Sequence, residues 1–266
     1  MEKFAFGREK NMMSSLFGSE DDSSSDEEGG TVPALIDENG SILFTSQTSG
    51  TAIQLLEHKA LGIAHQLWPA AKFMCNYLDE HSHLLSEHVG GSINILELGA
   101  GVGLCGLFAA AALRHHSDIK VTVVLTDLPE ALGGLNENIS LNGLNASVSS
   151  AELSWGVDGQ MERVFAMFDA PPLVIAADCV YYQCLFRPLF LTIKGLTDRG
   201  CVVIIAHVKR WKKDAKFFGM CRKHGMTVQL LHEIIEIIPA EHTGIPTSQT
   251  SQINRFSSTV PRRMCA

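Results

Sequence analysis

The chain has 266 residues, of which 45% are hydrophobic and only 7% aromatic, a composition that favours one α/β domain with a buried parallel sheet. The formal net charge is −8, and the acidic cluster between Glu20 and Glu28 accounts for most of it, so the remainder lacks the basic surface that nucleic acid requires. The longest apolar run, GVGLCGLFAAAAL, is shorter than the roughly 20 residues of a membrane span.

The cysteines predict an intracellular protein. Seven of them are scattered along the chain and none forms a C-x-x-C pair, which is typical of reduced thiols. The first residues carry acid instead of a basic stretch followed by an apolar one, so no secretory signal is predicted. We therefore expect a cytoplasmic protein, with the nucleus as a further compartment. No metal site is predicted, because no third ligand at a sensible spacing accompanies His81, His83, His115 and His116.

Composition divides the chain into three parts. Residues 1–32 end in GSEDDSSSDEEGG, which has too little apolar surface to offset the entropy of ordering and therefore predicts a disordered acidic tail. Residues 33–238 carry the periodic patterns of a folded domain. Residues 239–266 form a polar C-terminal tail whose structure the pattern does not define.

The folded part is expected to open with a β-hairpin extension. The stretches ALIDENGSILFTS and TAIQLLEH have the character of strands, and Glu38-Asn39-Gly40 predicts a turn between strands. The stretch WPAAKFMCNYLDEH then repeats apolar residues at helical spacing and predicts a helix that begins near Pro69.

Strand and helix patterns alternate from there on. Strands are expected at 93–98, 120–126, 146–151, 173–177 and 201–207, and helices near 103–114, 129–141, 184–197 and 212–224. Strands that are separated by helices imply right-handed crossovers. The pattern therefore predicts an α/β fold with a doubly wound, mostly parallel, Rossmann-like sheet.

A glycine-rich turn follows the first of these strands, in INILELGAGVGLCG. The stretch GVGLCG fits the G-x-G-x-x-G turn that holds the pyrophosphate of a nicotinamide cofactor at a helix N-terminus. An overlapping frame, E-x-G-x-G-x-G, runs through Glu97, Gly99, Gly101 and Gly103 and suits S-adenosylmethionine, whose amine and sulfonium favour a nearby carboxylate. The turn alone leaves both cofactors open.

The next strand ends at Asp127, within VVLTDLPEALGGLNENISLNG. A carboxylate at this point of a doubly wound fold binds adjacent ribose hydroxyls in either cofactor, so Asp127 does not discriminate between them. Leu128 is expected to pack on the adenine, and Pro129 suits the first turn of the following helix.

Asp178 and Tyr181 lie where this fold places the substrate, after the buried strand LVIAAD. They form D-x-x-Y, which differs from the D/N-P-P-Y/F of methyltransferases that act on amino groups of nucleic acid bases. The stretch DAPP at 169–172 resembles that motif but precedes the strand and lacks the aromatic residue, so it is interpreted as a loop. Trp68 and Trp155 lie near loop edges, where each either flanks a ligand or packs in the core.

These stretches together resemble the methyltransferase-16 family of seven-strand, S-adenosylmethionine-dependent enzymes, which are mostly non-histone protein-lysine methyltransferases. The matching stretches are GIAHQLWPAA, ILELGAGVGLCGL, LTDLPEALGGLNENISLN, LSWG, AADCVYY and HVKRWKKDAKFF. They run from about residue 50 to 235 in the order and spacing of the family, which makes the series far more specific than the glycine turn.

The resemblance implies S-adenosylmethionine as the cofactor and assigns roles to residues. The expected cofactor-binding residues are Trp68, Glu97, Gly99, Gly101, Asp127, Leu128, Trp155 and Ala177. Glu97 and the two glycines would line the methionine end and Asp127 would bind the ribose. Asp178 and Tyr181 would face the target side chain as the catalytic pair. The expected partner is a protein substrate with a target lysine, and the chain is expected to act as a monomer without nucleic acid or membrane.

The end of the chain departs from the family pattern. The family fold closes with a hairpin of two last strands, and TVQLLHEIIEIIP supplies only the first of them clearly. Either INRFSSTV, at 253–260, serves as the last strand, or that strand is absent and the exposed sheet edge weakens the fold and its activity. A catalytically inactive binding module and a small-molecule methyltransferase therefore stand as alternatives. A nicotinamide oxidoreductase is disfavoured because no Y-x-x-x-K pair follows the central strands.

Methyl transfer to lysine sets a further requirement. Attack needs a free lone pair, yet only about one lysine in a thousand is neutral near neutral pH. A desolvated aromatic channel lowers the pKa of the amine, whereas a carboxylate raises it. Asp178 is therefore expected to capture and orient the amine, and Tyr181 to shape the channel.

Overall fold

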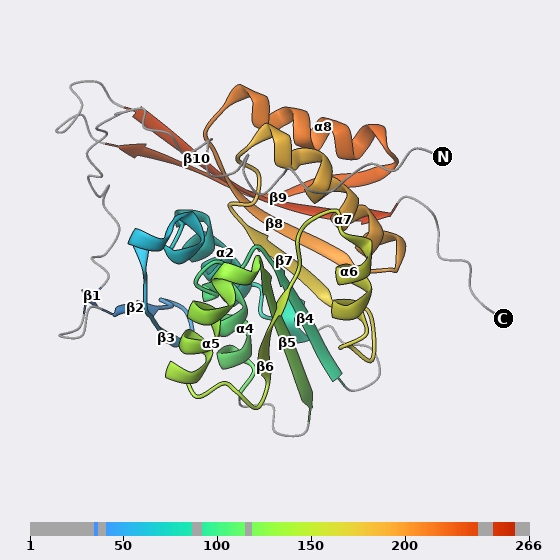
Figure 1. Cartoon of the computed structure of the whole chain (residues 1–266). Coiled ribbons are helices and arrows are strands. Elements are labelled where there is room, and N and C mark those ends of the chain that lie inside the picture. Colours follow the sequence, from blue (N-terminus) through green and yellow to red (C-terminus); the bar gives the residue numbers. More distant parts are fainter. Residues whose placement is uncertain (1–34, 37–40, 87–91, 115–118, 239–246, 259–266) are drawn as a thin grey trace. The chain divides into compact units, whose positions relative to one another are not determined.

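One seven-stranded sheet organises the described part of the chain, which comprises residues 35–36, 41–86, 92–114, 119–238 and 247–258 of this computed structural model (Figure 1). Its strands are β4 (Ser92–Leu98), β5 (Lys120–Asp127), β6 (Val148–Glu152), β7 (Leu173–Ala177), β8 (Val202–Lys209), β9 (Met226–Ile238) and β10 (Thr247–Ser258). They lie in the order β6-β5-β4-β7-β8-β10-β9. Only β10 runs opposite to the other six strands, so the expected mostly parallel seven-strand sheet is confirmed.

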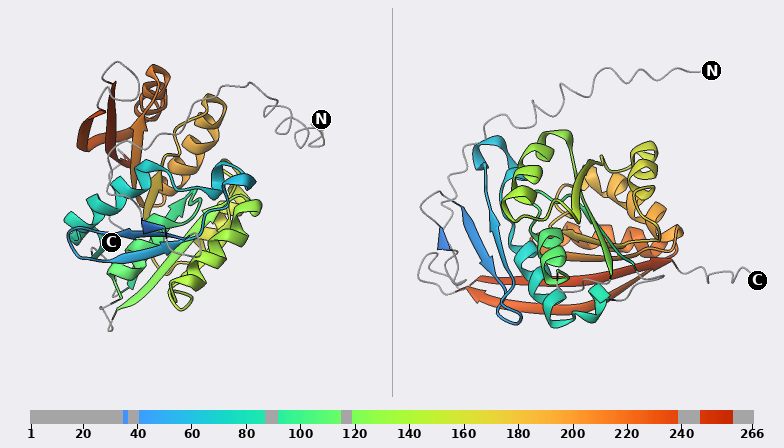
Figure 2. Two further views of the ribbon diagram at one scale, coloured as in Figure 1. Left: turned by 90° about the vertical axis from the view of Figure 1, so that its left-hand side faces the viewer. Right: turned by 90° about the horizontal axis from the view of Figure 1, so that it is seen from below.

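Helices cover both faces of the sheet (Figure 2). One face is covered by α2 (Pro69–Glu80), α4 (Leu104–Ala112) and α5 (Leu132–Leu141), and the other by α6 (Asp158–Phe165), α7 (Phe186–Asp198) and α8 (Ala215–Lys223). The shorter elements are α3 (His83–Ser86), η1 (Lys59–Leu61), η2 (Ile63–His65), η3 (Pro129–Ala131), η4 (Gln183–Leu185) and η5 (Lys212–Asp214). The result is the doubly wound α/β fold that the alternating pattern predicts.

The central strand β4 shows why the apolar pattern of the strands is clear in the sequence. All of its side chains are buried, because a parallel strand that is covered on both faces has no solvent side. Ile95 packs into the core beneath α2 and α4, whereas Leu96 packs into the core beneath α6 and α7. None of the helices within the described ranges has the length and apolar character that a membrane crossing requires.

Helix α6 was not among the expected elements. It has 8 residues, DGQMERVF, and only Met161 and Val164 are buried. A helix this short shows one apolar pair at helical spacing, which a periodicity search does not distinguish from a loop.

A second, antiparallel sheet lies before the main domain pattern begins. It consists of β1 (Leu35–Ile36), β2 (Ile42–Thr45) and β3 (Ala52–Leu55), which confirms the expected extended stretches. Asn138 of α5 ties this extension to the glycine turn, because it accepts from the Leu56 backbone N–H at 2.8 Å and donates to the Val102 carbonyl at 3.0 Å. The expected turn at 38–40 and the expected tail at 1–32 lie outside the described residues.

The polar C-terminal segment supplies the strand that the sequence left undefined. β10 lies between β8 and β9 and pairs with both along most of its length. The expected boundary at residue 238 therefore falls inside the sheet, and residues 247–258 must be counted with it. Ile253 and Phe256 are fully buried in the cores on opposite faces. Two apolar anchors among polar neighbours are too few to produce the alternation that identifies a strand from sequence.

Because β10 is anchored so sparsely, the substitution Phe256→Ala is expected to be costly. The Phe256 ring packs on Phe217 and Phe218, with ring centroids 6.3 and 6.0 Å away, and its removal leaves a cavity in the core. We expect a loss of about 3–5 kcal/mol in the free energy of unfolding, measured by urea denaturation. The control Leu230→Ala, at a side chain in β9 that is 48% exposed, should cost much less. Equal losses in the two variants would contradict the placement of β10.

Candidate active site

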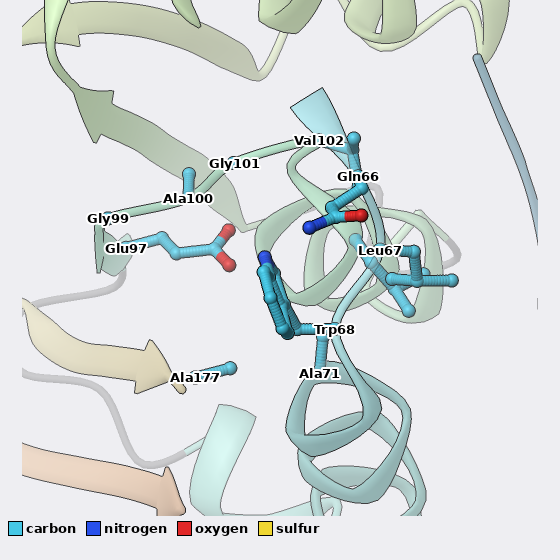
Figure 3. A pocket seen from close by; sticks show the side chains of 11 residues that line it. Gln66, Leu67, Trp68, Ala71, Glu97, Gly99, Ala100, Gly101, Val102 and Ala177 are labelled. Carbon is cyan, nitrogen blue, oxygen red and sulfur yellow. The ribbon is translucent and has the colours of Figure 1, made fainter. Parts of the chain in front are cut away.

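A pocket opens at the carboxyl end of β4, where the chain order of the strands reverses (Figure 3). Ligands of doubly wound folds bind at this position. The pocket is lined by Gln66, Leu67, Trp68, Ala71, Glu97, Gly99, Ala100, Gly101, Val102, Leu104 and Ala177. Five predicted cofactor residues thus lie together: Trp68, Glu97, Gly99, Gly101 and Ala177.

The glycine turn forms one wall of the pocket in left-handed backbone. The φ angles of Gly99, Gly101 and Gly103 are 58°, 57° and 85°, which residues with a Cβ adopt only at a cost. Asp127 fastens this turn to β5, because its Oδ2 accepts from the Gly101 N–H at 2.8 Å and its Oδ1 from the Leu128 N–H at 2.7 Å. Burial raises the pKa of Asp127, and the two N–H bonds act against that shift.

Trp155 lies directly against the first glycine of the turn. A Cβ on Gly99 would stand 2.9 Å from Trp155 Cζ2 and 3.0 Å from Cys179 Sγ. Trp155 is half-buried and also packs against the core beneath α6 and α7. It therefore borders the glycine turn and the core at once, so the two interpretations of this tryptophan are not exclusive.

Glu97 is a buried carboxyl group that points into the pocket (Figure 3). Its Oε2 accepts from the backbone N–H of Gly106, in the first turn of α4, at 2.8 Å. Burial raises the pKa of Glu97 to about 8, and the Gly106 N–H only partly offsets this effect. The pocket thus contains an acid that a bound cation would help to ionise.

Gly106 allows this close approach of α4 to the sheet. A Cβ there would stand 2.2 Å from Leu125 Cδ2 and 2.9 Å from Glu97 Oε2. We expect Gly106→Ala to lower the free energy of unfolding by about 1–3 kcal/mol through overpacking. A control exists in Gly133 of α5, where an added Cβ meets nothing within 4 Å, so Gly133→Ala should be neutral or stabilising. Thermal and urea unfolding measure both, and a neutral Gly106→Ala would contradict the packing.

The segment before α2 lies over the glycine turn. The Ala64 carbonyl would be 3.4 Å from a Cβ on Gly101, and Trp68 Nε1 donates to the Ile63 carbonyl at 2.9 Å. The Leu67 N–H donates to the Glu57 carboxylate. This segment brings Gln66 and Leu67 to the pocket, two lining residues that sequence reasoning missed because neither carries a chemical signal.

Asp178 is held in an unusual conformation next to the pocket. It has a φ of 54°, the one positive φ outside glycine in the described residues, and its carboxylate is buried. Backbone N–H groups of Ala70 and Val208 donate to the two oxygens at 3.3 Å each. Arg210 adds a bidentate ion pair, with Nη1 3.0 Å from Oδ1 and Nη2 3.1 Å from Oδ2.

Sequence reasoning did not single out Arg210. Its guanidinium bridges Asp178 and the face of Trp68, whose ring centroid is 5.4 Å away. Arg210 comes directly after the last residue of β8 just as Asp178 comes directly after the last residue of β7, and the carboxyl ends of neighbouring parallel strands meet at one sheet edge. This adjacency is the signal that could have identified Arg210.

The other predicted residues lie around the pocket rather than in its lining. Tyr181 is half-buried, and burial raises the pKa of its hydroxyl well above the ordinary value, so the group stays protonated. Its ring contacts that of Tyr182, with centroids 4.8 Å apart. Leu128 is half-buried at the start of η3, next to Asp127.

Comparisons with known proteins identify the family of the chain. The lysine methyltransferase family matches residues 47–224. The protein-lysine N-methyltransferase EFM6 of Saccharomyces cerevisiae is 32% identical over 61% of this chain and 71% of its own length. The EEF1A lysine methyltransferase 3 of Xenopus tropicalis is 33% identical over 64% of this chain and 69% of its own length.

A solved structure supports the fold independently. The S-adenosylmethionine-dependent methyltransferase from Agrobacterium tumefaciens shares 16% identity, covers 82% of this chain and 70% of its own, and superposes with a TM-score of 0.52. The pocket fits S-adenosylmethionine, since its lining includes the glycine turn and the carboxyl group of Glu97 and no basic side chain, and the Asp127 carboxylate binds the turn at Gly101. The chain therefore belongs to the lysine methyltransferase family, whose enzymes use S-adenosylmethionine as the methyl donor.

Proposed function

We propose that the protein transfers a methyl group from S-adenosylmethionine to the side-chain amine of a lysine in another protein. The observation that carries the proposal is the position of Asp178, which binds a cationic side chain at the rim of the cofactor pocket. The printed functions of the two relatives, protein-lysine and EEF1A-lysine methylation, support the same choice of substrate class.

The residues of the pocket divide the work of cofactor binding. Glu97 would face the cationic amine and sulfonium end, while Gly99 and Gly101 allow close approach of the backbone. Asp127 would bind the ribose hydroxyls through the acceptor capacity that its two backbone bonds leave free. When bound, S-adenosylmethionine supplies a methyl group activated on a sulfonium.

The amine site is defined by what Asp178 already binds. Four N–H donors occupy its two oxygens, which is the full acceptor capacity of a carboxylate. A lysine ammonium must therefore replace one of them. We propose that Arg210 yields, because its side chain is 30% exposed whereas the other two donors are fixed backbone groups. Asp178 would then capture and orient the amine, which is the role expected for it from the sequence.

Tyr181 and Trp68 would complete the channel for the amine. The Tyr181 hydroxyl stays protonated and acts as a hydrogen-bond partner, and the Trp68 face already accepts a cation from Arg210. Exclusion of water by these rings favours the neutral amine that methyl transfer needs. Alignment of the amine with the methyl group then supplies most of the acceleration.

The remaining expectations about the protein stay predictions. A monomeric state, a cytoplasmic or nuclear location and the absence of nucleic acid binding rest on composition and on the family resemblance. Each can be checked with the purified full chain and with its tagged form in cells.

The proposed function is tested by radiolabelled methyl transfer. The purified chain, lysates and S-adenosylmethionine that carries a labelled methyl group are incubated together, and labelled proteins are identified by mass spectrometry. Label on a lysine that disappears with Asp178→Asn supports the proposal. Label on small molecules alone would favour a small-molecule methyltransferase. Cofactor binding by calorimetry without any labelled product would favour an inactive binding module.

A further inference from the structure

The segment that joins β8 to α8 (Figure 1) carries several basic residues around Arg210. We name these residues the basic rim, which consists of Lys209, Arg210, Lys212, Lys213 and Lys216. All of these except the half-buried Lys213 are exposed. Trp211 stands among them with 58% of its surface exposed, and Lys213 Nζ lies 5.2 Å from the centroid of the Trp211 rings.

The basic rim is fixed next to the amine site. Arg210 reaches Asp178 and the Trp68 ring from this segment, so the rim begins where the target amine is expected to enter. Asp214 is buried and its Oδ2 accepts from the backbone N–H groups of Arg210 and Trp211, at 3.2 and 3.0 Å. These bonds hold the segment in one conformation, so less conformational entropy is lost when the segment binds a partner.

The positive charge of the rim is not neutralised within the described part of the chain. No carboxylate there lies within 4.0 Å of the ammonium groups of Lys209, Lys212, Lys213 or Lys216. The nearest acid in sequence, Asp214, is buried and bound to backbone. This local excess of positive charge contrasts with a formal net charge of −8 for the whole chain.

This charge distribution favours a target lysine with acidic neighbours over one with basic neighbours. A target lysine is itself a cation, so a basic segment would be repelled as it approached Asp178, whereas acidic neighbours would be attracted. We propose that the basic rim binds an acidic segment that flanks the target lysine in the substrate protein. The exposed Trp211 adds an aromatic anchor of the kind that concentrates binding energy at protein interfaces. The inference rests on the proposed function and deepens it by naming the substrate class.

An RNA ligand would use the same combination of charges and an aromatic ring. Two observations favour a protein segment instead. The rim is one short stretch, Lys209–Lys216, which matches a few acidic side chains rather than a long phosphate backbone. The formal charge of the whole chain is negative, which opposes a long polyanion more strongly than a short acidic segment.

The test measures peptide binding separately from methyl transfer. Three fluorescently labelled peptides carry one central lysine and acidic, neutral or basic flanks, and fluorescence anisotropy gives their affinity for the full chain with adenosylhomocysteine bound. We expect the acidic peptide to bind about tenfold more tightly than the neutral one at low salt, and the preference to fade as salt shortens the Debye length. The basic peptide should bind most weakly.

Two matched double variants locate the effect. Lys212→Glu/Lys213→Glu should abolish the preference for the acidic peptide, while Arg222→Glu/Lys223→Glu, with the same charge change at the far end of α8, should keep it. Equal binding of the three peptides, equal losses in both variants, or tighter binding of a labelled single-stranded RNA than of the acidic peptide would overturn the inference. Failure of methyl transfer alone, with the peptide preference intact, would instead count against the proposed function.

Discussion

Replacement of Asp178 by Asn is expected to lower the methyl-transfer rate at least about 100-fold, while the affinity for the cofactor stays nearly unchanged. The reason is that Asp178 binds a cationic side chain beside the pocket but is not among the residues that line it. Asn is the appropriate substitution because it tolerates the left-handed backbone that Asp178 adopts, with a φ of 54°. The variant therefore tests the charge rather than the fold.

Two measurements decide this prediction. Single-turnover transfer from labelled S-adenosylmethionine reports the rate, and calorimetry reports cofactor affinity. Arg210→Ala is the informative companion, because it vacates the Asp178 oxygens that the lysine amine is proposed to occupy. It should retain far more activity than Asp178→Asn. A parallel loss of cofactor affinity and activity in Asp178→Asn would overturn the division between amine site and cofactor site.

Cofactor binding is expected to strengthen with pH and to release a proton, because of Glu97. In the free protein burial raises the pKa of Glu97 to about 8, so the group is mostly protonated at neutral pH. A cationic cofactor favours the carboxylate, so its affinity should rise by up to about tenfold per pH unit as pH approaches 8 from below. Measurements kept below about pH 7.5 leave the α-amino group of the cofactor largely protonated.

The same group has the opposite effect on the stability of the free protein. The folded-state pKa of Glu97 lies above its unfolded value, so the folded state holds the proton more tightly. The resulting stabilisation is complete below the unfolded pKa and is lost as pH rises through about 8. Bound cofactor should offset that loss, which predicts a larger ligand-induced rise in melting temperature at about pH 7.5 than at about pH 6.

The matched variants are Glu97→Gln and Glu130→Gln. Calorimetry in two buffers with different ionisation enthalpies gives the number of protons released. Glu97→Gln should bind the cofactor at least about tenfold more weakly near pH 7.5 and should release no proton. Glu130, exposed in η3 at the next strand end, should behave like the unchanged protein when substituted. A pH dependence that survives in Glu97→Gln would show that another group carries it.

The predicted and observed elements agree best where a local sequence pattern defines them. The strands around β4 are continuous apolar runs because both of their faces are buried, and the observed bounds of β7 are those expected. Gly99, Gly101 and Asp127 were recognised because the turn and the carboxylate follow strand ends at a spacing that cofactor binding requires. The structure brings them together through one hydrogen bond, from Gly101 to Asp127.

Signals that depend on distant contacts were missed or left open. β10 has two buried apolar anchors, Ile253 and Phe256, and pairs with the backbones of β8 and β9. The sequence therefore offered residues 253–260 only as one of two alternatives and did not identify the strand from residue 247 on. Arg210 is one of several basic residues in HVKRWKKDAKFF. Its position directly after β8 places it at the sheet edge next to Asp178, and the ion pair with Asp178, 32 residues earlier, then distinguishes it from its neighbours.

The sequence by itself determined the α/β class and the order of the main elements, which follow from the hydrophobic period, and it predicted five of the residues that line the pocket, namely Trp68, Glu97, Gly99, Gly101 and Ala177. The tertiary structure alone decided that β10 completes the sheet, that Asp178 binds Arg210 and that a basic rim borders the amine site. The physical reason is that backbone pairing and ion pairs between separate strands depend on which segments the fold brings side by side, and no local pattern encodes that proximity.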